Sequence, residues 1–145
     1  MRTFAEHKEQ ATKDELEVAE AFRSRRGLTA GLSQKFCPFD IYLRDAAGKE
    51  LVGIVEVKRR NLEWGLFPTI HISQTKIENC LTLSHTLNVP FYLVIICRGD
   101  ALWMVRIKRS DFAEYHRKLG GRRDRFLKKD HEVLVDIPIE NFESL

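Results

Sequence analysis

Two carboxylates and an amine stand in two neighbouring apolar segments of the chain. Asp40 follows the residues Cys-Pro-Phe at 37–39, fifteen residues separate it from Glu56, and Lys58 follows Glu56 after one residue. Apolar segments of this kind usually form strands whose interiors hold no charge. A charged group at such a place needs a metal ion, an ionic partner or a chemical role. The trio is therefore the first candidate for an active site.

The trio suits metal-assisted phosphodiester chemistry. Side chains alternate faces along a strand, so Glu56 and Lys58 share one face about 6.6 Å apart, and a hairpin brings Asp40 beside Glu56. Two carboxylates that close resist joint ionisation, and a hard divalent cation such as Mg²⁺ resolves the conflict. Such an ion activates water, and Lys58 can orient that water or hold a phosphate oxygen. The alternative is a turn cap at Asp40 and an exposed ion pair between Glu56 and Lys58.

Length and composition limit the classes of protein. The 145 residues suit one domain, which we expect to span residues 1–145. Hydrophobic residues make up 43% and charged residues 31%, so disorder does not dominate. The three cysteines lack a CxxC pair, which predicts neither a zinc site nor a disulfide framework and favours the cytoplasm, or the host cytoplasm for a viral protein. The longest apolar run, residues 90–97, is too short to span a bilayer, so no membrane association is expected.

Apolar periodicity predicts the elements that position the trio. Residues 12–26 are predicted to form a helix with Thr12 as its N-cap, Glu15 as the capping-box partner, and Leu16 in the apolar stripe. The order of elements is α-β-β-α-β-β-α-β, which indicates a single mixed α/β sheet flanked by helices. The later elements are predicted as strands at 39–44 and 51–58 joined in a hairpin, a loop at 59–68, a helix at 73–87, strands at 91–97 and 101–107, a helix at 110–119 and a short strand at 132–137.

The two charged segments resemble a known motif. Pro38-Phe39-Asp40 and Glu56-Val57-Lys58 are similar to the motif of the PD-(D/E)XK nuclease superfamily, which has a restriction-endonuclease-like fold. The α-β-β-α-β-β order over residues 12–107 resembles the core of that fold, here followed by a C-terminal helix and a short strand. Within the superfamily the chain most resembles Holliday-junction resolvases and VRR-NUC type nucleases, including phage members. Phe39 separates the proline from the acid, whereas many relatives have them adjacent.

The resemblance implies a Mg²⁺ site in which Mn²⁺ is expected to substitute. Asp40 and Glu56 would bind the metal ion together with the backbone carbonyl of Val57. Lys58 would assist the attacking water.

Two further residues of the site are implied by the same resemblance. The superfamily often adds a glutamate from the first helix, and Glu15 is our choice, with Glu17 and Glu20 as alternatives. A capping-box role for Glu15 is equally open. Residues 72–76 resemble the glutamine at a helix start in the resolvase groups, which would be Gln74. A plain helix-start position is the alternative for Gln74.

Basic residues flank the motif and could contact nucleic acid. Arg59 and Arg60 follow it directly, and Lys76 lies at the start of the second helix. Trp64 and Phe67 could stack on bases or pack in the core. Clustered cations bind phosphates in a salt-dependent manner, although a solvated loop is the alternative. The denser basic cluster consists of Arg117, Lys118, Arg122, Arg123, Arg125, Lys128 and Lys129.

These observations predict a Mg²⁺-dependent DNA endonuclease. It would hydrolyse duplex or branched DNA with the structure selectivity of a resolvase, in recombination, repair or phage DNA processing. A homodimer is suggested by analogy with resolvases. The main alternative is a catalytically inactive nucleic-acid-binding module of the same fold. A metabolic enzyme ranks last, because the sequence has no Gly-rich phosphate loop and no evident Ser-His-Asp or Cys-His grouping.

Overall fold

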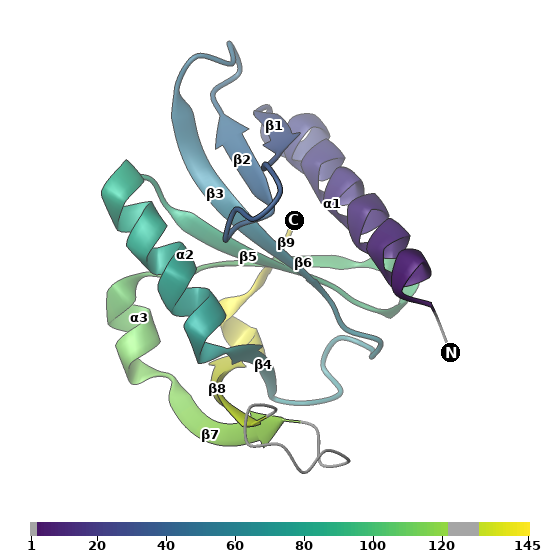
Figure 1. The fold of residues 1–145 in the computed structure, drawn as a ribbon, viewed down its shortest axis with the longest axis vertical. Helices are drawn as coiled ribbons and strands as arrows, with labels where there is room; N and C mark the ends of the chain where they lie inside the picture. Colours follow the sequence, from purple (N-terminus) through teal and green to yellow (C-terminus); the bar gives the residue numbers. More distant parts are fainter. Residues whose placement is uncertain (1–2, 122–130) are drawn as a thin grey trace.

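The computed structural model describes residues 3–121 and 131–145. Within these two ranges no helix is long and apolar enough to cross a membrane. The helices and strands are α1 (Phe4–Arg26), β1 (Thr29–Leu32), β2 (Ile41–Arg44), β3 (Leu51–Arg59), β4 (Thr69–Ser73), α2 (Gln74–Leu87), β5 (Phe91–Ile96), β6 (Leu102–Arg106), α3 (Arg109–Glu114), β7 (His116–Gly121), β8 (His131–Pro138) and β9 (Glu143–Ser144), with short 3₁₀ turns at Arg98–Asp100 and Ile139–Asn141 (Figure 1).

The main sheet has six strands in the order β1-β2-β3-β5-β6-β9. β3 and β5 run parallel, and every other neighbouring pair in this sheet is antiparallel. The chain passes from β3 to β5 through β4 and α2, because parallel neighbours need a long crossover. The predicted β2–β3 hairpin and the mixed sheet are both present, so the α/β class is confirmed.

Helix α1 covers one face of the main sheet. Its side chains Val18, Ala19 and Phe22 are buried in one cluster with Val55 of β3 and Val94 of β5. These two strand residues alternate with Ile54 and Leu93, which point to the other face. Both faces of β3 and β5 are therefore covered, which explains why β5 is a continuous apolar run.

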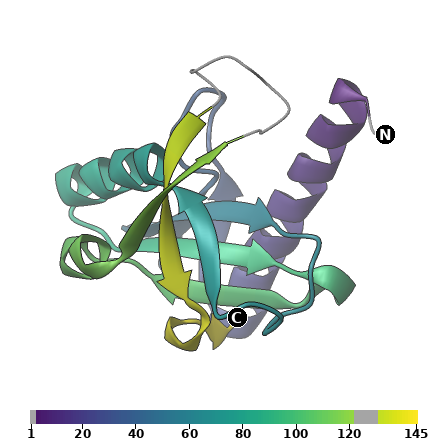
Figure 2. The ribbon, with the colours of Figure 1, turned by 90° about the horizontal axis from the view of Figure 1, so that it is seen from below.

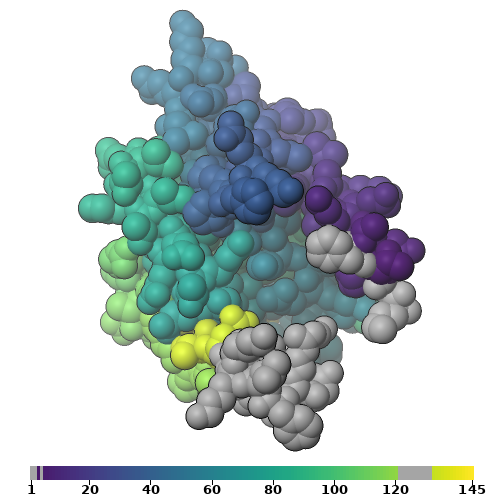
Figure 3. All heavy atoms as spheres, viewed as in Figure 1, coloured from purple at the N-terminus to yellow at the C-terminus, as the bar shows by residue number. Residues whose placement is uncertain are grey.

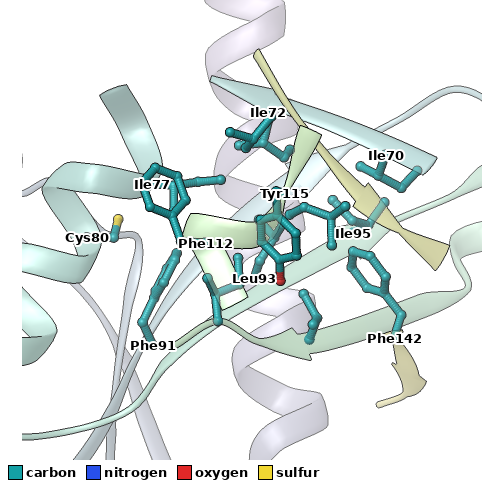
Figure 4. Packing of buried hydrophobic residues seen from close by; sticks show 14 of the residues in the cluster. Ile70, Ile72, Ile77, Cys80, Phe91, Leu93, Ile95, Phe112, Tyr115 and Phe142 are labelled. Carbon is teal, nitrogen blue, oxygen red and sulfur yellow. The ribbon is translucent and has the colours of Figure 1, made fainter. Parts of the chain in front are cut away.

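The opposite face holds the larger core. Ile77 and Cys80 of α2, Phe112 of α3, and strand residues such as Leu93 and Ile95 pack together there (Figure 4). A second, three-stranded sheet in the order β4-β8-β7 closes this core, contributing buried isoleucine and valine side chains. Figure 2 shows this small sheet lying across the main one, on the side away from α1.

Helix α1 starts earlier than the sequence predicted. Thr3 is its N-cap and forms a capping box with Glu6, whereas Thr12 lies inside the helix and its hydroxyl donates to the Lys8 carbonyl. The predicted capping role of Thr12 and Glu15 is therefore wrong. Leu16 is also not in the apolar stripe, because its side chain is 49% exposed. The residues just before position 12 are mostly polar, so the apolar pattern did not show that the helix begins at Phe4.

The single predicted sheet and the helix at 110–119 also need correction. Strands β1 and β4 were not predicted, and β4 belongs to the second sheet. Helix α3 ends at Glu114, and the next residues form β7, which pairs antiparallel with β8. A Cβ at Gly120 would lie 2.3 Å from Leu134 Cδ1, so any larger residue there would force the Leu134 side chain to move. Long-range pairing, which a local pattern does not report, decides these segments.

Helix α2 agrees with the sequence prediction. Ser73 is its N-cap, accepting from the Lys76 backbone N–H, and Asn88 ends it in the left-handed conformation at φ 54°. This fixed start directs the first turn of α2 toward the end of β3, where the charged motif lies.

Candidate active site

The charged motif lines a cavity of about 490 Å³. α1, α2 and the C-terminal end of β3 contribute its walls, and it opens between α1 and α2 on the face seen in Figure 3. The lining is polar or charged at nearly every position. Its residues are His7, Gln10, Ala11, Asp14, Glu15, Asp40, Glu56, Val57, Lys58, Arg59, Arg60, Asn61 and Lys76.

Asp40 is fixed at the entrance to β2. Its backbone N–H donates to the Val55 carbonyl at 2.8 Å, and its Oδ2 accepts from the Val57 N–H at 2.8 Å. Asp40 thus extends the hydrogen bonding between β2 and β3 by one residue, just before β2 begins at Ile41. This places Asp40 beside Glu56, as the hairpin predicted.

Glu56 is the most unusual group in the cavity. Its side chain is 2% exposed in the interior of β3. Glu56 Oε1 lies 3.4 Å from Lys76 Nζ and 3.7 Å from Lys58 Nζ, whereas Oε2 is buried without a hydrogen-bond partner. Burial, followed by the charge of Asp40, raises the pKa of Glu56 to about 8, although the two lysines oppose the shift. An unpaired buried carboxylate oxygen costs stability, which points to a function for the group.

Glu15 brings a third carboxyl group from α1. Burial and the adjacent Asp40 raise the pKa of Glu15 to about 7. The two alternatives on the same helix do not line the cavity: Glu17 is exposed, and Glu20 forms a surface ion pair with Arg23 at 3.1 Å. The structure therefore brings the carboxyl groups of Glu15, Asp40 and Glu56 to one cavity.

The chemistry of these groups fits a divalent cation. Three carboxyl groups face one polar cavity, two of them have raised pKa values, and Glu56 Oε2 lacks a partner. Mg²⁺ prefers oxygen ligands of this kind. Within the described part of the chain, however, no group of three or more His, Cys, Asp or Glu side chains is arranged closely enough to hold a metal ion. Cation binding would compete with the contacts that Glu56 makes with the two lysines.

Lys76 lies beside the carboxylate of Glu56, a position that the sequence did not indicate. We predicted that it would contact nucleic acid, but its ammonium group lies closer to Glu56 than that of Lys58 does. Burial lowers the pKa of Lys76, but the charges of Glu56 and Asp40 outweigh it and raise that pKa overall. The only sequence signal was its place in the first turn of a helix that follows the motif.

The sequence also missed Asp14, which ties α1 to β3. Asp14 is 5% exposed, and both of its oxygens accept from the Arg59 guanidinium at 2.8–3.1 Å. Gln10 donates a further bond to Asp14 at 2.8 Å, and Arg59 also reaches Asp100 at 3.0 Å. This clamp fixes the rotation of α1, so that the next residue, Glu15, faces the cavity. Arg59, predicted to bind nucleic acid, is thus held by two carboxylates.

Replacing Asp14 with alanine is expected to lower the free energy of unfolding by about 2 kcal/mol, because a partly buried guanidinium loses charge-assisted hydrogen bonds. Urea denaturation measures the change. Glu9→Ala is the matched control, since Glu9 is an exposed carboxylate of the same helix. Equal stability of the two variants would show that the clamp does not hold α1.

Of the other basic residues predicted to contact nucleic acid, one lines the cavity and the rest do not or lie outside the described residues. Arg60 lines the cavity, and its guanidinium donates to the His71 carbonyl at 3.0 Å. Gln74, which was predicted as a catalytic residue, does not line the cavity, and its Oε1 accepts from Arg117 Nε at 3.2 Å. Lys118 Nζ lies 2.8 Å from His71 Nε2. The remaining residues of the basic cluster lie outside the described residues, namely Arg122, Arg123, Arg125, Lys128 and Lys129.

Trp64 and Phe67 separate into two environments. Trp64 stacks on Trp103 at 4.8 Å between ring centroids and meets the edge of Phe142 at 5.0 Å. Trp64 therefore packs against the core, which agrees with the second of the two alternatives for this residue. Phe67 is 54% exposed in the loop between β3 and β4.

Comparisons with known proteins agree with this arrangement. The sequence profile of the family described as "Phage putative PDDEXK endonuclease" matches residues 5–145. Among solved structures, the fold is similar to that of Hjc, described as a Holliday junction resolvase from the archaeal hyperthermophile Archaeoglobus fulgidus, with a TM-score of 0.64 at 14% identity. This similarity covers 94% of the chain and 92% of Hjc, and it confirms the restriction-endonuclease-like fold. No curated protein sequence matches the chain.

Proposed function

The chain belongs to the phage PDDEXK endonuclease family, and we propose that it hydrolyses DNA in a Mg²⁺-dependent reaction at the cavity that holds Glu15, Asp40 and Glu56. The observation that carries this proposal is the buried carboxylate of Glu56, one oxygen of which has no partner. A merely structural residue at this position would be apolar, like its neighbours in β3. The cost of keeping an acid there is consistent with a catalytic role.

Glu15, Asp40, Glu56 and the backbone carbonyl of Val57 are the groups that would hold the cation. When bound, the cation would polarise a phosphoryl oxygen and make water easier to deprotonate at neutral pH. Asp40 is prepared for this role because the Val57 N–H fixes one of its oxygens. Glu56 would be held in its ionised form, which burial otherwise disfavours.

The lysine of the motif would act on the substrate. Lys58 and Lys76 are equally exposed, at 36% each, and the Lys58 ammonium group makes the longer of the two contacts with Glu56. It would hold a phosphate oxygen or orient the attacking water, while Lys76 stays paired with Glu56.

We expect duplex or branched DNA as the substrate. The family to which the chain belongs favours DNA as the nucleic acid. Similarity in fold to a protein described as a Holliday junction resolvase favours branched DNA. Arg60 at the cavity and the basic cluster at 117–129 would bind the flanking phosphates. A homodimer that cuts two strands together suits this substrate.

Cleavage assays test the proposal. The purified chain is incubated with supercoiled plasmid and with a synthetic four-way junction, in Mg²⁺, in Mn²⁺ and in EDTA. We expect cleavage in either metal and none in EDTA. Asp40→Ala should abolish cleavage, whereas Glu50→Ala, an exposed carboxylate at the far end of the same hairpin, should cleave like the wild type. Equal activity of wild type and Asp40→Ala would refute the assignment, and DNA binding without cleavage would identify an inactive binding module.

A further inference from the structure

Phe36 is an aromatic side chain held in open solvent, four residues before Asp40 of the cavity. It is 91% exposed, the highest value among the large apolar side chains that the structure describes. Its backbone has a φ of +71°, in the left-handed region that bulky residues rarely adopt. An exposed ring on a strained backbone is unfavourable for folding, so a role in binding is the natural explanation.

The loop that carries Phe36 is fastened to the candidate active site. Ser33 closes its base, because the Ser33 N–H donates to the Asp40 carbonyl at 2.9 Å and the Ser33 hydroxyl donates to the Phe39 carbonyl. A tight turn forms its tip, where the Cys37 N–H donates to the Gln34 carbonyl at 3.1 Å. Figure 3 shows this loop (blue) lying between α1 (purple) and α2 (teal), on the side where the cavity opens. The ring thus stands four residues from Asp40 on a short, closed loop.

The neighbour of Phe36 adds a positive charge. Lys35 Nζ lies 5.2 Å from the centroid of the Phe36 ring, in a cation–π contact. Both side chains are exposed. An aromatic face beside an ammonium group matches a nucleotide, in which a base and a phosphate are covalently linked. An apolar protein surface would not favour the lysine, so nucleic acid suits this loop better than a second protein does.

Building on the endonuclease function proposed above, we propose that Phe36 stacks on an unstacked base next to the scissile phosphate, while Lys35 contacts the adjoining backbone. A base inside a continuous duplex has both faces covered and offers no stacking surface. The loop would therefore select DNA with an unpaired or flexed nucleotide, such as a branch point. Phe36 is in this sense a residue that determines substrate specificity.

Cleavage of two DNA substrates that differ only in branching tests the inference. A four-way junction and a continuous duplex of the same sequence are cut by the wild type, by Phe36→Ala and by the control Leu87→Ala, which removes an exposed apolar side chain from the C-terminal end of α2. We expect Phe36→Ala to cut the junction about tenfold more slowly and the duplex at an unchanged rate. The control should match the wild type on both. An equal effect of Phe36→Ala on both substrates, or none on either, would overturn the inference.

A fluorescence measurement separates this inference from the proposed function. In Phe36→Trp, stacking on a base should quench the fluorescence of the new indole. The measurement is made in EDTA, so it does not depend on DNA cleavage. The two native tryptophans, Trp64 and Trp103, stack on each other and serve as the background. Quenching by the junction but not by the duplex supports the inference even if the wild type cuts no DNA. In that case only the endonuclease function would be refuted. Absence of quenching would overturn the stacking role. So would a sedimentation experiment in which the wild type is a dimer and Phe36→Ala is not.

Discussion

Replacing Glu56 with glutamine is expected to abolish DNA cleavage and to make the protein more stable. The amide keeps the shape of the side chain but cannot supply a negative charge to a cation, so we expect a rate loss of about a thousandfold. The same change removes a buried group whose ionised form is disfavoured. The free energy of unfolding at pH 8 should rise on the order of 2 kcal/mol.

The sign of the stability change follows from the pKa of Glu56. It is about 8 in the folded protein, against an ordinary value of 4.5. The folded state therefore binds a proton more tightly than the unfolded chain between these two values. The resulting stabilisation is complete below about pH 4.5 and is lost as the pH rises through about 8. Without divalent cations, wild-type stability should fall from pH 5 to pH 8.

Urea denaturation in EDTA at several pH values measures this effect. Glu56→Gln should show a much flatter pH dependence, with a remaining slope of the same sign from Glu15, whose pKa is also raised. The control Glu50→Gln changes an exposed carboxylate of the same hairpin and should retain the wild-type slope. A Glu56→Gln protein that cleaves DNA normally and keeps that slope would contradict both the catalytic role and the strained burial of Glu56.

Replacing Lys58 with methionine is expected to lower kcat by about a hundredfold or more while the protein stays folded. The reason is that Lys58 supplies a positive charge where negative charge develops in the transition state. Its side chain is one-third exposed, so the loss costs little packing. Lys49→Met is the matched control, because Lys49 is an exposed lysine in the turn of the same hairpin.

Single-turnover kinetics at saturating enzyme separate the effects of Lys58→Met on chemistry from those on binding. We expect the cleavage rate constant to fall and the Kd for DNA in EDTA to change less than threefold, since one exposed lysine contributes little to affinity. A variant with an unchanged rate constant but a much weaker Kd would show that Lys58 only binds the DNA backbone.

Local pattern was sufficient to predict that the three residues at the centre of the candidate site lie together. The positions of Asp40, Glu56 and Lys58 follow from strand alternation and from a hairpin, and both depend on residues close in sequence. The helix start at Ser73 and its end at Asn88 likewise follow from local capping chemistry. These features appear in the structure where the sequence places them.

The supporting residues could not be predicted because they depend on long-range packing. Asp14 meets Arg59 across 45 positions of sequence, and Lys76 reaches Glu56 only because α2 starts at the end of β3. The small sheet was missed for the same reason, since β4 and β7 are joined by β8 from the end of the chain. The fold is similar to that of Hjc although only 14% of the residues are identical. This is expected if the fold depends on the pattern of apolar and polar positions more than on particular residues.

The most direct test of the central claim is anomalous diffraction from crystals soaked in millimolar Mn²⁺. The claim is that the carboxyl groups of Asp40 and Glu56 form a cation-binding centre. We predict a strong anomalous peak within about 2–2.5 Å of oxygens from both side chains. A well-diffracting soaked crystal with no peak in this cavity would contradict the account.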